Sequence, residues 1–234
     1  MYHSVQRAMA WSGIGVIVLT AAGFVLARLL PVPPGADLSA QQVADFYSAH
    51  PTATRLGFLV ASVGLCFLGP MVALITTQML RIDGAPASLA QLQQIGGIGV
   101  IVVVVVPTIM MNAAAFRPDR DPVATQTIND VAWLLFVTAI GLFFLQEVPI
   151  GIAILIDRTV RPVFPRWVGY VNLSVPLTFL PALMAYFFKS GPFAWQGLLV
   201  FYLGLGTFGL WVSVMTWALL RAVSEQEAAS PRSQ

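Results

Sequence analysis

Six long apolar stretches follow one another along this chain of 234 residues and constrain its fold more than any other feature. A helix needs about 20 consecutive, mainly apolar residues to cross the hydrocarbon core of a bilayer. Because only 9% of the residues are charged, against about 25% in soluble domains, the chain cannot coat its apolar residues with a water-facing surface. The sequence therefore predicts an all-α membrane protein, a bundle of six transmembrane helices. These are expected at about 10–30, 53–80, 89–115, 127–156, 166–188 and 196–220.

The chain divides into one transmembrane helical domain over residues 1–222 and a polar tail over 223–234, which we expect to be cytoplasmic and disordered. Pro70 lies inside the second apolar stretch, where we expect a kink because proline cannot donate the helical hydrogen bond. Cys66, the one cysteine, is expected to be a packed, inert thiol.

The connection after the first apolar stretch has a helical pattern of its own. Ser39 and Gln42 have the spacing of a capping box, and Val43, Phe46 and Tyr47 then recur on one helical face. The pattern predicts a short amphipathic helix in the first outer loop, lying at the membrane surface.

The positions of the basic residues indicate an orientation. The N-terminus, the second and fourth connections and the tail hold seven arginines, and the other three connections hold five basic residues. Because cytoplasmic loops carry an excess of Lys and Arg, both termini are expected in the cytoplasm and the protein in the plasma (inner) membrane. Tryptophans are then expected to form a belt at each interface: Trp11, Trp167 and Trp217 at the inner one, and Trp133 and Trp195 at the outer one.

Several chemistries are disfavoured by what the sequence lacks. Two histidines and one cysteine are too few for a clustered metal site, and no HExxH, CxxC or Walker motif occurs, so we predict no metal and no cofactor. The net charge of +2 gives no indication of nucleic-acid binding. The string GLGTFG matches a dinucleotide pattern, but no strand precedes it. Close helix packing on the face of Gly206, Gly209 and Ser213 is the expected role.

Glu147 is the one clearly ionisable residue deep in an apolar stretch, and such residues are functional candidates. At 100° per residue, Asn129, Phe136 and Ile140 fall on the same stripe as Glu147, and Trp133 and Phe143 are expected nearby. Pro149 predicts a kink beside it. Glu147 is therefore our candidate catalytic acid or base, in a cavity. The alternative is a neutral or paired carboxyl that holds helices together.

A second group of candidates lies at the outer face, in the outer connections and the adjoining helix ends. Besides Phe136 and Phe143, which belong with Glu147, the ligand-binding candidates are His50, Asn112, Arg117, Asn129, Asp130 and Trp133 at this outer face. They could form the mouth of a site. The alternative is a hydrogen-bonded lid with ion pairs such as Arg117 with Asp130, because charges in loops are usually solvated.

Six strings, FYSAHPTATRLG, QMLRIDG, AAFRPDRDP, INDVAWLLF, VFPRWVGY and FFKSGPFAW, resemble a family of uncharacterised actinobacterial multi-pass integral membrane proteins. The resemblance covers nearly the whole chain. It implies the membrane class and an actinobacterial source, and it supplies no catalytic residues.

Three functions remain open. The first is an enzyme or binder for a hydrophobic small molecule, such as a sterol, terpenoid or other lipid-like compound, in an intramembrane pocket, with a carboxyl for acid–base chemistry. The second is a non-catalytic accessory subunit of a larger membrane complex, with a membrane protein as its partner. A transporter is disfavoured because no inverted repeat is evident and few polar residues lie near the middle of the apolar stretches.

Overall fold

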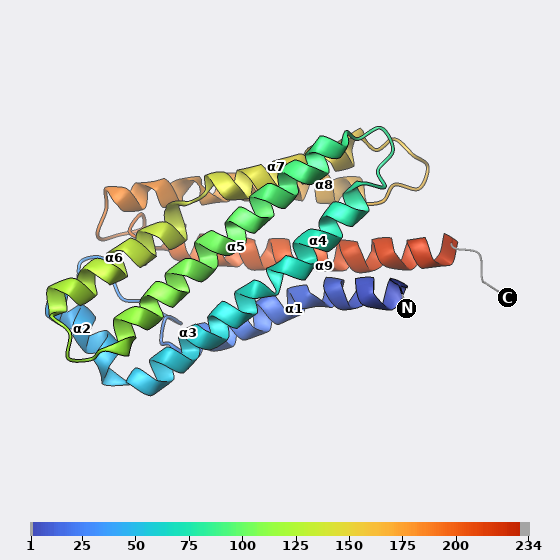
Figure 1. The fold of residues 1–234 in the computed structure, drawn as a ribbon. Coiled ribbons are helices and arrows are strands. Elements are labelled where there is room, and N and C mark those ends of the chain that lie inside the picture. Colours follow the sequence, from blue (N-terminus) through green and yellow to red (C-terminus); the bar gives the residue numbers. More distant parts are fainter. Residues whose placement is uncertain (1, 230–234) are drawn as a thin grey trace.

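The computed structural model describes residues 2–229, and within this range every regular element is a helix. Six of the helical segments in the described chain are long and apolar enough to cross a membrane, so the predicted six-helix bundle is confirmed. Both ends of the described chain lie at the same end of an elongated bundle, and α2 lies at the opposite end (Figure 1).

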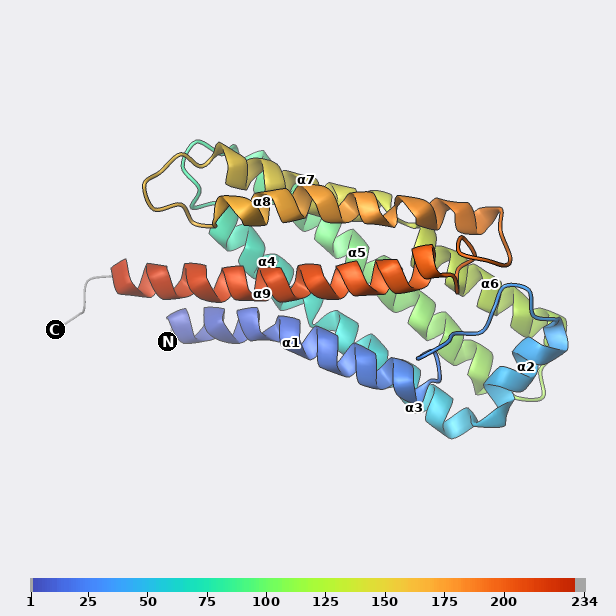
Figure 2. The same ribbon diagram turned by 180° about the vertical axis from the view of Figure 1, so that it is seen from behind.

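The first three spans are one helix, two helices and one helix, in that order. The first is α1 (Tyr2–Leu26), the second is α3 (Pro51–Cys66) with α4 (Leu68–Met79), and the third is α5 (Ala87–Phe116). The short helix α2 (Ala40–Ala49) lies between the first and the second span. Each of the other three spans combines two elements: α6 (Pro122–Thr138) with α7 (Gly141–Ile156), α8 (Arg166–Ser174) with the 3₁₀ helix η1 (Val175–Tyr186), and the π-helical turn η2 (Leu198–Tyr202) with α9 (Leu203–Ala229). In Figure 2, α9 runs between α1 and α8.

The second span is interrupted at Phe67, where α3 ends and α4 begins. Pro70 accounts for the interruption, because it has no N–H to donate to the carbonyl of Cys66, four residues earlier, and its ring would clash with that carbonyl. The expected kink is thus confirmed. The thiol of Cys66 is exposed on the outside of the bundle, so the expectation of a packed cysteine is wrong.

The fourth span breaks at Ala139 and Ile140, and α7 continues through Pro149 without interruption. The N–H of Ile140 bonds to the carbonyl of Thr138 at 2.7 Å instead of to the carbonyl one helical turn back. The interruption of the fourth span thus precedes Glu147, and the kink expected at Pro149 stays a prediction. The break also ends the helical phase, so a stripe counted at 100° per residue cannot be extended from α6 into α7.

Small residues set the distance between several helices. A Cβ atom on Gly23 of α1 would lie 2.5 Å from the backbone nitrogen of Ala61 of α3. A Cβ on Gly96 of α5 would lie 2.5 Å from the backbone nitrogen of Gln146 of α7. Gly206 and Gly209 of α9, by contrast, have no atom within 4 Å of such a Cβ. The expected close packing on that face of α9 is wrong; α1, α3, α5 and α7 make the close contacts instead.

The short helix α2 begins as predicted, with Ser39 and Gln42 in a reciprocal capping box. Its apolar face does not remain free for a membrane surface, because Val43 and Tyr47 are buried and α2 packs on α6.

The C-terminal part of the chain is more regular than expected. Helix α9 continues to Ala229, and Arg7 forms an ion pair of 2.7 Å with Glu227. The prediction of a disordered tail is therefore wrong as far as Ala229. Residues 230–234 lie outside the described range.

Candidate functional site

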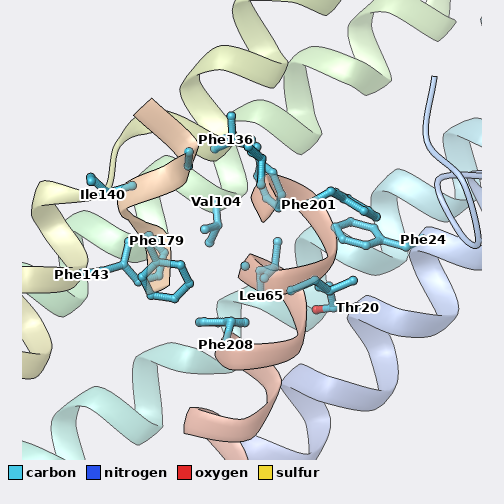
Figure 3. Close-up of a pocket in the computed structure, with 15 residues that line it drawn as sticks. Thr20, Phe24, Leu65, Val104, Phe136, Ile140, Phe143, Phe179, Phe201 and Phe208 are labelled. Carbon is cyan, nitrogen blue, oxygen red and sulfur yellow. The ribbon is translucent and has the colours of Figure 1, made fainter. Parts of the chain in front are cut away.

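A pocket of about 80 Å³ lies inside the bundle, and all six spans contribute to its wall. Figure 3 shows the rings of Phe143 and Phe179 on one side and those of Phe24 and Phe201 on the other. The pocket is lined by Thr20 and Phe24 of α1, Leu65 of α3, Val104 of α5, Phe136 and Val137 of α6, Ile140, Phe143 of α7, Phe179 and Ala182 of η1, Val200 and Phe201 of η2, and Gly204, Leu205 and Phe208 of α9.

The pocket lies where three spans depart from α-helical geometry. The break between α6 and α7 contributes Ile140, the 3₁₀ helix η1 contributes Phe179, and the π-helical turn η2 contributes Val200 and Phe201. The 3₁₀ stretch is 12 residues long, whereas such helices rarely exceed about four residues. Irregular turns of this kind are frequent at functional sites. Their convergence makes this pocket the leading candidate for a binding site.

Thr20 supplies the one polar side chain among the lining residues of the described chain. Its side chain is buried, with 6% of the residue exposed, and its hydroxyl has no hydrogen-bond partner among residues 2–229. Threonine hydroxyls in helices commonly bond to the carbonyl four residues earlier. Thr207 does so at 2.7 Å and Thr216 at 2.7 Å. The Thr20 hydroxyl is therefore available to a molecule in the pocket.

The rest of the wall is aromatic and aliphatic. The ring of Phe143 lies 4.8 Å from that of Phe179 and 6.1 Å from that of Phe208, measured between centroids. Behind the wall, the ring of Trp133 contacts those of Phe136 and Phe201 at 6.2 Å and 5.8 Å. Such a surface favours an apolar occupant and offers no charge to an ionic one.

Trp133 and Trp195 do not form the expected interfacial belt. Their rings stack at 6.1 Å with an interplanar angle of 8°, and both residues are buried. The indole N–H of Trp195 donates to the carbonyl of Pro34 at 2.9 Å. These two tryptophans therefore join the connection after α1 to the interior of the bundle. Trp11, Trp167 and Trp217, in contrast, are each about half exposed.

Glu147 is fully buried on α7, one helical turn after Phe143, and it is not among the pocket-lining residues. Neither of its carboxyl oxygens has a hydrogen-bond partner in the described part of the chain. Its side chain therefore faces the bundle interior. The structure does not bring it together with the pocket, and Phe136 and Phe143 are the sequence candidates that do line it.

The polar candidates near α2 do not converge on a cavity. Tyr47 donates a hydrogen bond of 2.9 Å to Asn129, whose amide donates to Asp130 at 3.3 Å. Burial, with a smaller effect from the Asp130 carboxylate, raises the pKa of Tyr47 and keeps its hydroxyl a donor. Asn112 donates to the carbonyl of Arg55 at 3.3 Å. The bond of Tyr47 to Asn129 fixes α2 on α6, in line with the hydrogen-bonded alternative, and the bond of Asn112 joins α5 to α3.

The remaining two candidates of that group are exposed. His50 joins α2 to α3, and Arg117 ends α5. The expected ion pair of Arg117 with Asp130 is wrong, because the ion pairs among the described residues are Arg7 with Glu227 and Arg221 with Glu225. The Asp130 carboxylate accepts a hydrogen bond from Asn129 and is influenced by the charge of Lys189, with which it forms no ion pair among the described residues.

Sequence reasoning missed most of the pocket. Several residues that line the pocket were not predicted as site residues, among them Thr20, Phe24, Leu65, Val104, Phe179, Phe201 and Phe208. A threonine or phenylalanine in an apolar stretch carries no distinguishing local signal, because most such residues pack against other helices.

No family model, no curated protein and no solved structure matches the chain. The fold itself defines the class: a multi-pass helical membrane protein with an apolar pocket between its spans. The resemblance to the actinobacterial family stays a prediction.

Proposed function

We propose that this protein binds a hydrophobic small molecule in the pocket between its six spans. The observation that carries the proposal is the pocket wall, which is apolar except for the buried, unpartnered hydroxyl of Thr20. A buried hydroxyl without a partner is unfavourable by about 1–3 kcal/mol. A bound molecule that presents an oxygen to Thr20 would relieve this penalty.

The dimensions narrow the class of ligand. A pocket of about 80 Å³ is smaller than the roughly 300–1,000 Å³ of ordinary small-molecule sites. It suits a linear or isoprenoid chain segment better than the fused rings of a sterol. Among the classes considered, a terpenoid or fatty compound with one alcohol or carbonyl oxygen therefore fits best.

We assign no catalytic step to Glu147, because the candidate acid or base is not in the pocket wall. A carboxyl that cannot reach the bound molecule cannot transfer a proton to it. The proposed activity is accordingly binding.

The orientation is part of the proposal. We place the protein in the plasma membrane with both termini in the cytoplasm, since the arginines favour that side. Reporter fusions after residue 35 and after residue 120 should both be external, and a cytoplasmic signal at either position would reverse the orientation.

Photolabelling tests the proposed binding. A long-chain alcohol carrying a diazirine should label pocket residues such as Phe208 in the purified protein. The labelling should saturate as the concentration of the alcohol rises. Val104→Phe should abolish this labelling by filling the pocket, because Val104 lines it and is 4% exposed. Val102→Phe is the matched control on α5, 52% exposed, and should label normally.

Labelling spread evenly over the outside of the bundle, equal in both variants, would contradict the proposal. A stoichiometric membrane protein that copurifies in that case would favour the alternative, a non-catalytic accessory subunit.

A further inference from the structure

A second cavity, of about 530 Å³, lies at the end of the bundle where the described chain begins and ends, and it is separate from the proposed ligand pocket. Its charged lining residues are Arg81, Arg161, Arg221 and Glu225, and the other residues along it are apolar. Two connections, α4 to α5 and α7 to α8, reach this end beside the last turns of α9 (Figure 1). Three arginines from distant parts of the sequence therefore meet around one cavity.

The charges of the cavity do not cancel. Glu225 accepts a hydrogen bond of 2.7 Å from Nε of Arg221, which pairs one of the three cations. Arg161 forms no ion pair with any residue from 2 to 229. Three positive groups and one negative group leave the described lining with a net charge of +2.

Neutral groups hold the Arg81 guanidinium in place. It donates to the amide oxygen of Gln78 and, at 3.2 Å, to that of Gln226. Partial burial lowers the pKa of Arg81, and the electrostatic effects of Tyr2 and, to a smaller extent, Glu225 oppose this change. Amide oxygens orient the guanidinium without neutralising it, so Arg81 is a positioned cation that can still bind an anion.

The level of the cavity in the membrane follows from its aromatic neighbours. The guanidinium carbon of Arg221 lies 5.9 Å from the ring of Trp217, and the rings of Trp217 and Trp167 are 5.3 Å apart. Both tryptophans are about half exposed. Tryptophan in such a setting is typical of the headgroup layer of a bilayer. Arg221 at the cavity is thus at the depth of lipid phosphates.

We propose that this cavity binds a phosphate group, presented by the headgroup of an anionic lipid or by a soluble phosphorylated molecule. Guanidinium groups donate two parallel hydrogen bonds to phosphate oxygens. Basic cavities at the ends of transmembrane helices bind anionic lipid headgroups on this principle. Arg81 and Arg161 contact the phosphate. Arg221 remains paired with Glu225 and adds to the positive electrostatic potential of the cavity.

Native mass spectrometry of the detergent-purified protein tests the site with two probes, phosphatidylglycerol and inorganic phosphate. Phosphatidylcholine serves as the lipid of zero net charge. Phosphatidylglycerol should be retained in preference to phosphatidylcholine, and Arg161→Gln should weaken its binding by about fivefold, the contribution of one basic group near an anionic surface. Arg158→Gln is the matched control: it removes the same charge from the same connection, and Arg158 does not line the cavity.

A competition between the two probes distinguishes the sources of the phosphate group. Displacement of the lipid by millimolar inorganic phosphate indicates a site for soluble anions, and resistance to it indicates a lipid headgroup site. Equal weakening of phosphatidylglycerol binding in Arg161→Gln and Arg158→Gln would overturn the proposal. The lipid would then respond to the total charge of this connection and not to the cavity. Equal retention of the two lipids, with no phosphate bound, would overturn it as well. Arg161 and Arg158 lie in a connection between helices, so both variants are expected to fold.

Discussion

The hydroxyl of Tyr47 on α2 donates a hydrogen bond of 2.9 Å to Oδ1 of Asn129 on α6, and both side chains are buried. This bond joins a short helix outside the six spans to one of the spans. The rings of Tyr47 and Phe58 of α3 lie 6.4 Å apart, which adds an apolar contact on the same side. Tyr47 therefore anchors α2 at its end of the bundle.

Tyr47→Phe should lower the free energy of unfolding by about 1–2 kcal/mol, because Asn129 Oδ1 would be left buried without its donor. The measurement is thermal unfolding in detergent. Tyr170→Phe is the control, since Tyr170 is 56% exposed and should behave as wild type. An unchanged midpoint for Tyr47→Phe would show that the bond does not hold α2 in place.

The same residue predicts a dependence on pH. Burial raises the pKa of Tyr47 above the ordinary value of about 10. Above about pH 10 the unfolded state loses the phenolic proton while the folded state keeps it. The stabilisation is therefore complete below about pH 10 and is lost as the pH rises further. Stability should fall more steeply between about pH 10 and 11.5 in wild type than in Tyr47→Phe, and parallel curves would contradict this.

Glu147→Leu should not destabilise the protein and should stabilise it by about 1 kcal/mol, because neither carboxyl oxygen has a partner in the described residues and leucine removes a buried polar group. Glu147→Gln should leave labelling of the pocket unchanged, since Glu147 does not line it. Loss of more than about 1 kcal/mol on substitution by leucine would indicate the interhelical hydrogen bonds of a structural carboxyl.

Gly96→Ala should destabilise by about 1–3 kcal/mol, because the added methyl group would force α5 away from the backbone of α7. Gly206→Ala is the matched substitution in a helix with open space around it. It should be neutral or stabilise by up to about 1 kcal/mol through its helix propensity. Equal effects of the two substitutions in thermal unfolding would contradict the close approach of α5 and α7.

Features encoded by neighbouring residues could be predicted from the sequence. The apolar length of each stretch fixes a span, and the spacing of Ser39 and Gln42 fixes the start of α2. Pro70 breaks a helix for a local steric reason. Each of these depends on residues within one continuous segment of the chain, so no knowledge of the packing between helices is required.

The pocket could not be predicted in this way. Thr20 and Phe201 are far apart in the sequence and meet only through the packing of helices. The break at Ala139 and Ile140 contains no proline, and without it the stripe from Asn129 to Glu147 appears continuous. The unpartnered state of the Thr20 hydroxyl is likewise a property of the folded chain, because it depends on every neighbour that fails to reach it.

The most direct test of the central claim compares two compounds, a long-chain alcohol and the alkane of equal length, as competitors of the photoreactive probe for the pocket. In wild type, a long-chain alcohol should displace the photoreactive probe at about two- to tenfold lower concentration than the alkane of equal length, as one hydrogen bond to Thr20 implies. Thr20→Val keeps the shape of the side chain and removes its hydroxyl. In this variant the alcohol and the alkane should displace the probe at equal concentrations. An alcohol preference that survives in Thr20→Val, or no displacement by either chain in wild type, would contradict the account.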